Sequence, residues 1–350
     1  MNFEILIPSY CPNEKIIDLV KVLIHNGMKS ITIIDDGSGK EYEAIFNKLA
    51  SIGCNVLHHP KNRGKGAALK TGIEEIMKRV TMIAYIITAD GDGQHAPSDI
   101  KKLVESIENS SLSDQTCLWL GVRDFKGKDV PWKSRYGNMF SSLYFRLSTN
   151  STCLDTQTGL RAIPANLFLE ALSINGDRYD YEMNFLMKVA NQKRKILHFP
   201  IQTIYEEGNQ GSHFHPIKDS FKIYKTFIKY VLSSASCAII DIVLFAVFCF
   251  LPIETVVTKI IVATVLARIC SGIVNFTMNR FWSFESKKRG GKQAIRYSIL
   301  FVAIMISSSV LVSLGTVFPL PSAFIKIPVD TGLFILSYFV QLKWVFVGEK

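Results

Sequence analysis

The chain has few charged residues, and its cysteines form no recognisable motif. Only 20% of its 350 residues are charged, whereas a soluble domain usually carries about 25%. Its 7 cysteines form no CxxC pair, so neither a zinc site nor a disulfide framework is indicated, and we expect reduced thiols facing the cytosol. The first residues lack the pattern of a signal peptide, and we expect none. These absences exclude a disordered chain and a secreted mini-protein.

The scarcity of charge is confined to the second half. Residues 226–350 carry 12 Lys and Arg and 5 Asp and Glu among long apolar runs, whereas residues 1–225 have the mixture of a soluble protein. The net charge of +10 does not indicate nucleic acid, because the first half has no basic helix with interleaved aromatics. The excess charge lies beside apolar runs, so anionic membrane lipid is the expected partner. A purely soluble enzyme is excluded.

Short apolar runs alternate with helical stretches in the first half. Strands are expected at Phe3–Pro8, Ile31–Ile34, Asn55–His58, Met82–Thr88 and Leu118–Val122. Helices are expected at about Glu14–Asn26, Glu41–Ser51, Lys65–Arg79 and Pro97–Asn109. This alternation predicts an α/β fold with a mostly parallel sheet and helices on both faces. Ligands of such sheets bind beyond the carboxyl ends of the strands.

Polar segments follow four of these strands. They are Pro8–Tyr10, Asp35–Ser38, Asn62–Gly66 and Asp90–Gln94. Singly, each is more often a solvated turn or a helix cap, and Asn62–Gly66 lacks the P-loop pattern. Four in order at one edge of a sheet predict a binding site.

The pair Asp90 and Asp92 gives this site its chemistry. Residues i and i+2 leaving a strand point to the same side, and two carboxylates suit a hard divalent cation that also binds phosphate oxygens. Gln94 offers a third oxygen, and Arg63 and Lys65 beside two glycines suit a diphosphate.

The order of these motifs resembles the family 2 glycosyltransferases of the GT-A fold, above all the polyprenyl-phosphate branch with dolichyl-phosphate mannose synthase and GtrB-like enzymes. The resemblance covers about residues 1–215 and implies a Rossmann-like GT-A catalytic domain. It implies donor binding by Pro8, Tyr10, Glu14, Ile34, Asp36, Arg63, Asp90, Gly91 and Asp92. Asp90, Asp92 and Gln94 would hold Mg²⁺ or Mn²⁺. The family usually writes P-x-Y-N-E, whereas here Cys11-Pro12-Asn13 precede Glu14.

The resemblance also implies an acceptor site and a sugar pocket. Arg123 and Arg135 match the family's two arginine motifs and would bind the acceptor phosphate, since guanidinium binds phosphate in a bidentate way. The segment Asp155–Arg161 resembles D-x-Q-x-G-x-[RK], whose Gln157 would line the sugar pocket. The absence of Q-x-x-R-W indicates transfer of a single sugar.

Two further segments complete the predicted site. Glu182 is expected to face the sugar, in preference to Asp180, so the catalytic residues would be Asp92, Arg123, Arg135, Gln157 and Glu182. The polar, glycine-rich segment Glu206–Phe214 is typical of a mobile lid. The mannose synthases carry Arg and Lys there, whereas this chain has Ser212-His213-Phe214, which favours a donor other than GDP-mannose.

The second half predicts four membrane helices. The apolar stretches are about 230–251, 256–279, 295–318 and 323–345, and each is long enough to span about 30 Å of hydrocarbon. The basic connection 280–296 and the absence of Lys and Arg from the turns at 252–255 and 319–322 place both termini and the catalytic domain in the cytosol. We expect the plasma membrane of a bacterium.

The membrane half resembles GtrA-like domains, because Asn275–Trp282 matches N-F-x-x-N-[RK]-x-W and Lys343–Phe346 echoes it. The predicted domains are 1–215, an amphipathic juxtamembrane helix at 216–229, and 230–350 with an all-α four-helix membrane fold. A second surface helix is expected at Trp132–Leu147, although core packing explains its apolar stripe almost equally well. Asp241 is expected to pair with Arg268, because unpaired charges within a membrane are costly.

The combined prediction is a metal-dependent, inverting transfer of one sugar to a polyprenyl phosphate. The donor would be UDP-glucose, UDP-GlcNAc or GDP-mannose, and the acceptor undecaprenyl or dolichyl phosphate. Two alternatives stay open: translocation of a lipid-linked sugar by the membrane half, and glycolipid synthesis on a hydroxyl acceptor. The sequence leaves a homo-oligomer open as well.

Overall fold

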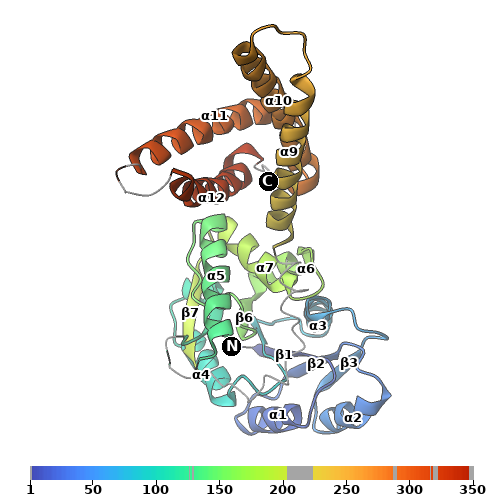
Figure 1. Ribbon diagram of the computed structural model, residues 1–350. Coiled ribbons are helices and arrows are strands. Elements are labelled where there is room, and N and C mark those ends of the chain that lie inside the picture. Colours follow the sequence, from blue (N-terminus) through green and yellow to red (C-terminus); the bar gives the residue numbers. More distant parts are fainter. Residues whose placement is uncertain are drawn as a thin grey trace. The chain divides into compact units, whose positions relative to one another are not determined.

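The computed structural model describes residues 2–125, 127, 130–202, 224–286, 290–315, 317 and 322–346. Their contacts divide the chain into two units, Met1–Ile223 and Tyr224–Lys350, which are described separately (Figure 1). The predicted lid residues Ser212 and His213, and residues 216–223 of the predicted juxtamembrane helix, lie outside the described residues.

The first unit is built on a seven-stranded sheet. Its strands are β1 (Phe3–Ser9), β2 (Ile31–Asp35), β3 (Asn55–His58), β4 (Tyr85–Thr88), β5 (Leu118–Arg123), β6 (Arg161–Pro164) and β7 (Ile196–Ile201). They lie in the order β3-β2-β1-β4-β6-β5-β7. β6 is antiparallel to both of its neighbours, β4 and β5, and the other pairs are parallel. The first residue of β6 therefore lies at the same edge as the last residue of β4.

Helices cover both faces of this sheet (Figure 1). They are α1 (Lys15–His25), α2 (Glu43–Ser51), α3 (Lys65–Arg79), α4 (Pro97–Glu108), α5 (Trp132–Thr149), α6 (Phe168–Ser173) and α7 (Asp180–Asn191). Side chains of β1 alternate between two apolar cores: Ile5 and Ile7 pack with α1, α2 and α4, whereas Leu6 packs with α3, α6 and α7. Burial on both faces explains the unbroken apolar run Ile5–Pro8 in β1.

The predicted α/β architecture is confirmed. Helix α3 begins and ends where the sequence predicts, at Lys65 and Arg79, and β3 agrees to the residue. Strands β6 and β7 and helix α6 were not predicted. Helix α5 confirms the predicted helix at Trp132–Leu147, and five of its apolar side chains are exposed: Trp132, Tyr136, Met139, Phe140 and Leu143.

In the described part of the second unit, four helices are long and apolar enough to cross a membrane. They are α9 (Lys225–Phe248), α10 (Val256–Met278), α11 (Gly290–Gly315) and α12 (Ser322–Val340). Helices α10 and α12 each continue into one π-helical turn, η5 (Asn279–Ser283) and η6 (Gln341–Val345). The predicted pair is confirmed, since Arg268 Nε lies 3.5 Å from Asp241 Oδ2.

Candidate active site

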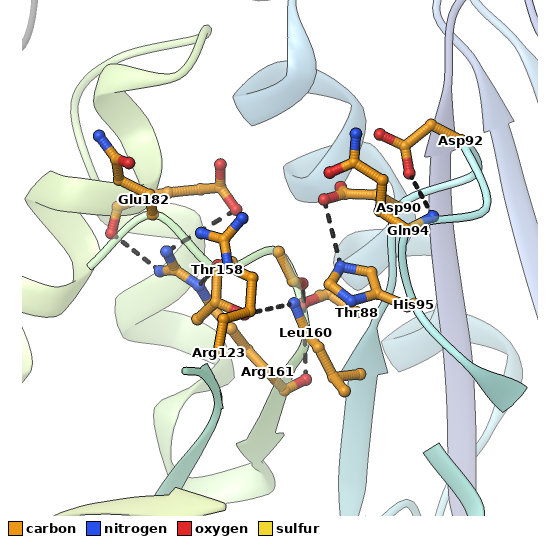
Figure 2. Close-up of polar contacts among 12 residues, drawn as sticks. Thr88, Asp90, Asp92, Gln94, His95, Arg123, Thr158, Leu160, Arg161 and Glu182 are labelled. Carbon is orange, nitrogen blue, oxygen red and sulfur yellow. Dashed lines mark hydrogen bonds and ion pairs between the residues drawn. The ribbon is translucent and has the colours of Figure 1, made fainter. Parts of the chain in front are cut away.

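The carboxyl end of β4 carries the paired aspartates. Asp90 and Asp92 lie in the turn between β4 and α4, and Asp92 accepts a hydrogen bond of 3.0 Å from the backbone N–H of Gln94. The buried His95 places its Nε2 at 3.3 Å from Asp90 Oδ2 (Figure 2). Gly91 packs against the apolar core, where an added Cβ would lie 3.0 Å from Ile16.

Lys65 joins this turn to α7. As the first residue of α3, it places its Nζ 2.7 Å from Asp90 Oδ1 and 3.2 Å from Glu182 Oε2. Its side chain is only 16% exposed. Burial alone would lower the pKa of Lys65, but the two carboxylates raise it overall. Burial likewise opposes ionisation of Asp90, yet Lys65 and His95 hold the pKa of that carboxyl well below its usual range.

Arg161 supports Glu182 from the other side. It is the first residue of β6 and is only 2% exposed. Its guanidinium donates to the carbonyl oxygens of Thr158 at 3.0 Å and Glu182 at 2.9 Å, and its Nη2 lies 3.8 Å from Glu182 Oε1. Figure 2 shows this group facing the turn that holds Asp90, Asp92 and Gln94. Because β6 is antiparallel to β4, the two groups meet at one sheet edge.

Two glycines allow these elements to approach closely. A Cβ added to Gly159 would lie 2.1 Å from Asp90 Oδ2, so the carboxylate occupies the space of the missing side chain. Gly64, at the start of α3, has φ +104°, and a Cβ there would lie 2.3 Å from the carbonyl oxygen of Asp177. Only glycine adopts this conformation readily and leaves the necessary room.

Asp36 fixes the segment that precedes α3. Its carboxylate accepts hydrogen bonds from the backbone N–H of Arg63 at 2.9 Å and of Gly64 at 2.7 Å. His59 Nδ1 lies 2.7 Å from the same carboxylate. Asp36 is only 3% exposed, so it connects the end of β2 to the start of α3.

The other predicted donor residues lie along the ends of β1 and β2. Pro8 and Ile34 are paired neighbours in adjacent strands; both are buried, and Ile34 belongs to the core between the sheet and α3. Tyr10 follows β1 and is 37% exposed. Glu14 is exposed and precedes α1, where its carbonyl accepts the N–H of Ile17 at 2.9 Å.

Arg123 is bound to a buried carboxylate. Its Nε and Nη2 donate to the two oxygens of Asp155 at 2.7 and 3.0 Å, and Asp155 is fully buried. Asp155 also accepts the backbone N–H of Gln157 at 3.0 Å. One carboxylate therefore orients both the arginine at the end of β5 and the segment predicted to line the sugar pocket.

Arg135 lies on α5 and holds the segment after β5. Its Nε donates to the carbonyl oxygen of Phe125 at 3.0 Å and its Nη2 to that of Gly127 at 2.7 Å. The structure thus places Arg123 and Arg135 at the two ends of one short connection.

The donor set at Asp90 and Asp92 fits a divalent cation. Burial and the neighbouring Asp90 raise the pKa of Asp92, which reflects two negative charges held close together with limited solvation. A hard cation would relieve that repulsion, and the carboxylates and the Gln94 amide oxygen are its preferred ligands. Within the described residues, no cluster of three or more His, Cys, Asp or Glu side chains has the geometry of a metal site.

Sequence reasoning did not identify His95 or the joint contact of Lys65 with Asp90 and Glu182. His95 follows Gln94 directly, so its position next to the paired aspartates was a usable signal. Nothing in the sequence relates Lys65 to Glu182, because their contact depends on how α3 packs against α7.

Both units match known families. The family described as Glycosyl transferase family 2 matches residues 4–164, and the one described as GtrA/DPMS, transmembrane domain, matches residues 229–346.

This chain is similar in sequence to three relatives from archaea and bacteria. The uncharacterized protein MJ1222 of Methanocaldococcus jannaschii is 31% identical over 207 residues, which cover 58% of this chain and 82% of the relative. The UDP-N-acetylglucosamine–dolichyl-phosphate N-acetylglucosaminyltransferase of Methanococcus voltae is 29% identical, covering 63% of this chain and 92% of its own length. The undecaprenyl-phosphate mannosyltransferase of Micrococcus luteus is 25% identical, and the match covers 51% of this chain and 72% of the relative.

Proposed function

This chain belongs to glycosyl transferase family 2, and we propose that it transfers a single sugar from a nucleotide sugar to a polyprenyl phosphate, with inversion. The names of the M. voltae and M. luteus relatives support a polyprenyl-phosphate acceptor. UDP-glucose, UDP-GlcNAc and GDP-mannose are the candidate donors.

One observation carries this proposal: Lys65 joins the aspartate turn to Glu182, which Arg161 supports. This group combines carboxylates for a cation with a buried lysine at the start of a helix, where a diphosphate is favoured. Asp36 holds Arg63 at the same helix start, so Arg63 is positioned to approach the diphosphate. Pro8, Tyr10, Glu14, Ile34 and Gly91 are assigned to the donor site with them.

Asp90, Asp92 and Gln94 would hold Mg²⁺ or Mn²⁺, which supplies positive charge to the departing nucleoside diphosphate. The protein's own contribution is to keep the two carboxylates in place. His95 holds Asp90 from one side, and the close approach of Gly159 limits its movement on the other.

The acceptor is assigned to the side of Arg123 and Arg135. A phosphate monoester has its second pKa near about 6, so it is already largely ionised at neutral pH and needs orientation more than deprotonation. Asp155 orients Arg123 and the Gln157 segment together. The exposed apolar side chains of α5 lie on the helix that carries Arg135 and suit an isoprenoid chain or a membrane surface.

Both termini and the catalytic unit are assigned to the cytosol. The support is the basic connection 280–296 between apolar helices, since cytoplasmic loops carry an excess of Lys and Arg. Nucleotide sugars are cytosolic, and this agrees with a catalytic unit on the cytosolic side of the membrane. The plasma membrane of a bacterium is the proposed location, and 1–215, 216–229 and 230–350 are the proposed domains.

The test uses the purified full-length protein with Mn²⁺, undecaprenyl or dolichyl phosphate, and a panel of UDP- and GDP-sugars, followed by mass spectrometry of the lipid. A polyprenyl-phosphate monosaccharide identifies donor and acceptor together. Asp92→Asn should abolish its formation, whereas Asp18→Asn, which changes an exposed carboxylate on α1, should leave it unchanged. Unchanged turnover in Asp92→Asn would refute the metal assignment.

Absence of product with every donor would contradict the proposed transfer. If labelled lipid-linked sugar still crossed vesicles containing the protein, translocation would replace it. A sugar found on a lipid hydroxyl would instead indicate glycolipid synthesis.

A further inference from the structure

The second unit, or membrane unit, consists of two helical hairpins: the first is α9 and α10 with η5, and the second is α11 and α12 with η6. Asn275, Phe276, Asn279, Trp282 and Phe284 in the first hairpin have the same spacing as Ser337, Tyr338, Gln341, Trp344 and Phe346 in the second. Asn279 and Gln341, 62 positions apart, each open a π-helical turn. The first helix of each hairpin also has, in its N-terminal part, a basic residue followed by tyrosine: Lys229-Tyr230 in α9 and Arg296-Tyr297 in α11.

Polar contacts cross between the hairpins in both directions. The central pair is Asn279, whose Nδ2 donates to Gln341 Oε1 at 3.0 Å. The tyrosine of each hairpin contacts the other hairpin: the hydroxyl of Tyr297 donates to Asn275 at 2.7 Å, and Gln341 donates to the hydroxyl of Tyr230 at 3.5 Å. Hydrogen bonds of this kind hold helices together in a membrane.

The aromatic rings repeat this exchange. Phe284 stacks on Tyr338 with ring centroids 5.8 Å apart, and Phe346 stacks on Phe276 at 5.9 Å. Phe284 and Phe346 stack on each other with ring centroids 4.9 Å apart. At this end, matching positions of the two hairpins therefore exchange ring contacts with approximate two-fold symmetry.

Each hairpin also places its basic residue over its own tryptophan. Lys229 Nζ lies 6.0 Å from the centroid of Trp282, and Arg296 Cζ lies 5.8 Å from that of Trp344. Tryptophan beside Lys or Arg is typical of the membrane–water interface. The two cation–tryptophan pairs are thus equivalent in position.

The two pairs differ in how the cation is neutralised. Lys229 forms an ion pair with Glu285 at 2.5 Å, and its side chain is 15% exposed. Arg296 donates instead to the neutral carbonyl oxygen of Trp344 at 2.9 Å, and it forms no ion pair with a carboxylate among residues 224–286, 290–315 and 322–346. The position equivalent to Glu285 is Val347, which carries no charge.

We propose that Arg296, with Trp344 beside it, binds the phosphate group of a membrane lipid, and that Glu285 closes the equivalent position at Lys229. A guanidinium retains further N–H donors after one is used by a carbonyl, and its planar fork matches phosphate oxygens. Anionic lipid attracts basic residues at the membrane surface. The two matching hairpins supply two such basic positions. Glu285 neutralises Lys229 at the first, so we assign lipid binding to Arg296 at the second.

The test measures lipid retention by the full-length protein, by native mass spectrometry with two separate probes, phosphatidylglycerol and undecaprenyl phosphate. Arg296→Gln should weaken binding of the probe that occupies this site about tenfold, which is the scale of one charge-assisted hydrogen bond. Arg296→Lys keeps the charge but loses the planar fork, so its binding should lie between that of the unaltered protein and that of Arg296→Gln, which separates loss of the ligand contact from misfolding. Lys229→Gln is the matched control and should bind as the unaltered protein does.

Glu285→Gln gives the sharper result, because release of Lys229 should add one bound lipid to the number that the unaltered protein retains. Loss of one probe alone in Arg296→Gln identifies the source of the phosphate as a phospholipid or a polyprenyl phosphate, and either supports the site. Equal retention in Arg296→Gln, equal losses in Lys229→Gln and Arg296→Gln, or no gain in Glu285→Gln would overturn it. The readout does not depend on sugar transfer.

Discussion

Replacement of Lys65 by methionine removes the cation that joins two carboxylates. Methionine fills a similar volume, so the change isolates the charge. In the unaltered protein the ammonium lies 2.7 Å from Asp90 and 3.2 Å from Glu182 with only 16% of its side chain exposed. In the variant both carboxylates would remain in a poorly solvated place with one partner fewer.

Breaking a buried ion pair in this way costs about 3–5 kcal/mol. For a unit of this size about 3 kcal/mol corresponds to a fall in Tm of roughly 6–12 °C. The loss should depend on pH. Asp90 has a folded pKa below its unfolded value of about 4, and Lys65 has one above its unfolded value of about 10.4. Their pairing is therefore fully present between these values and is lost as pH falls through the folded pKa of Asp90.

The assay is thermal unfolding of the full-length protein in detergent, with Trp119 kept as the one fluorescent reporter after the other three of the 4 tryptophans are replaced by phenylalanine. The gap in Tm should be largest near neutral pH and shrink below about pH 4. Lys78→Met, on the same helix but in an exposed pair with Glu74, should lower Tm by less than about 2 °C. Equal effects of the two substitutions, or a gap that does not change with pH, would refute the assigned role of the buried lysine.

Three further substitutions test other contacts. Gly159→Ala should displace the Asp90 carboxylate, because its Cβ would lie 2.1 Å from that group; we expect kcat/KM for sugar transfer to fall about 100-fold with little change in Tm, and normal turnover would contradict this. Asp155→Asn should weaken the bidentate contact with Arg123, and unfolding followed by Trp119 fluorescence should show a loss of about 3 kcal/mol. Asn279→Leu removes the central polar contact of the membrane hairpins and should lower the free energy of detergent-induced unfolding, followed by circular dichroism, by about 1 kcal/mol.

The parts of the fold predicted from the sequence are those with strong local signals. Helix α3 follows Gly64 directly and has apolar residues at helical spacing, so its bounds at Lys65 and Arg79 were predictable. β6 is only four residues long and is antiparallel to both neighbours, and its position between β4 and β5 follows from pairing that no local pattern encodes. β7 contains Pro200, which lowers the strand signal, and proline is acceptable there because β7 is an edge strand.

The residues of the candidate site were likewise predictable only where a local sequence signal exists. The polar residues after β4 could be assigned to one sheet edge because strand direction fixes where Asp90 and Asp92 emerge. Their ion pairs could not be predicted, since the contact of Lys65 with Glu182 joins elements that are distant in sequence. The carboxylate partner of Arg123 was likewise hidden, although Asp155 lies within the motif that was recognised.

The exchanged contacts of the membrane hairpins have a consequence for assembly. Each hairpin offers an amide, a tyrosine and stacking rings to a partner that closely resembles itself. A surface that is complementary to a near-copy of itself is suited to an isologous interface between two copies of the chain. A chain that ended after Phe284 would therefore keep a self-complementary face, and two such chains should associate through it, with Asn279 of one copy bonded to Asn279 of the other.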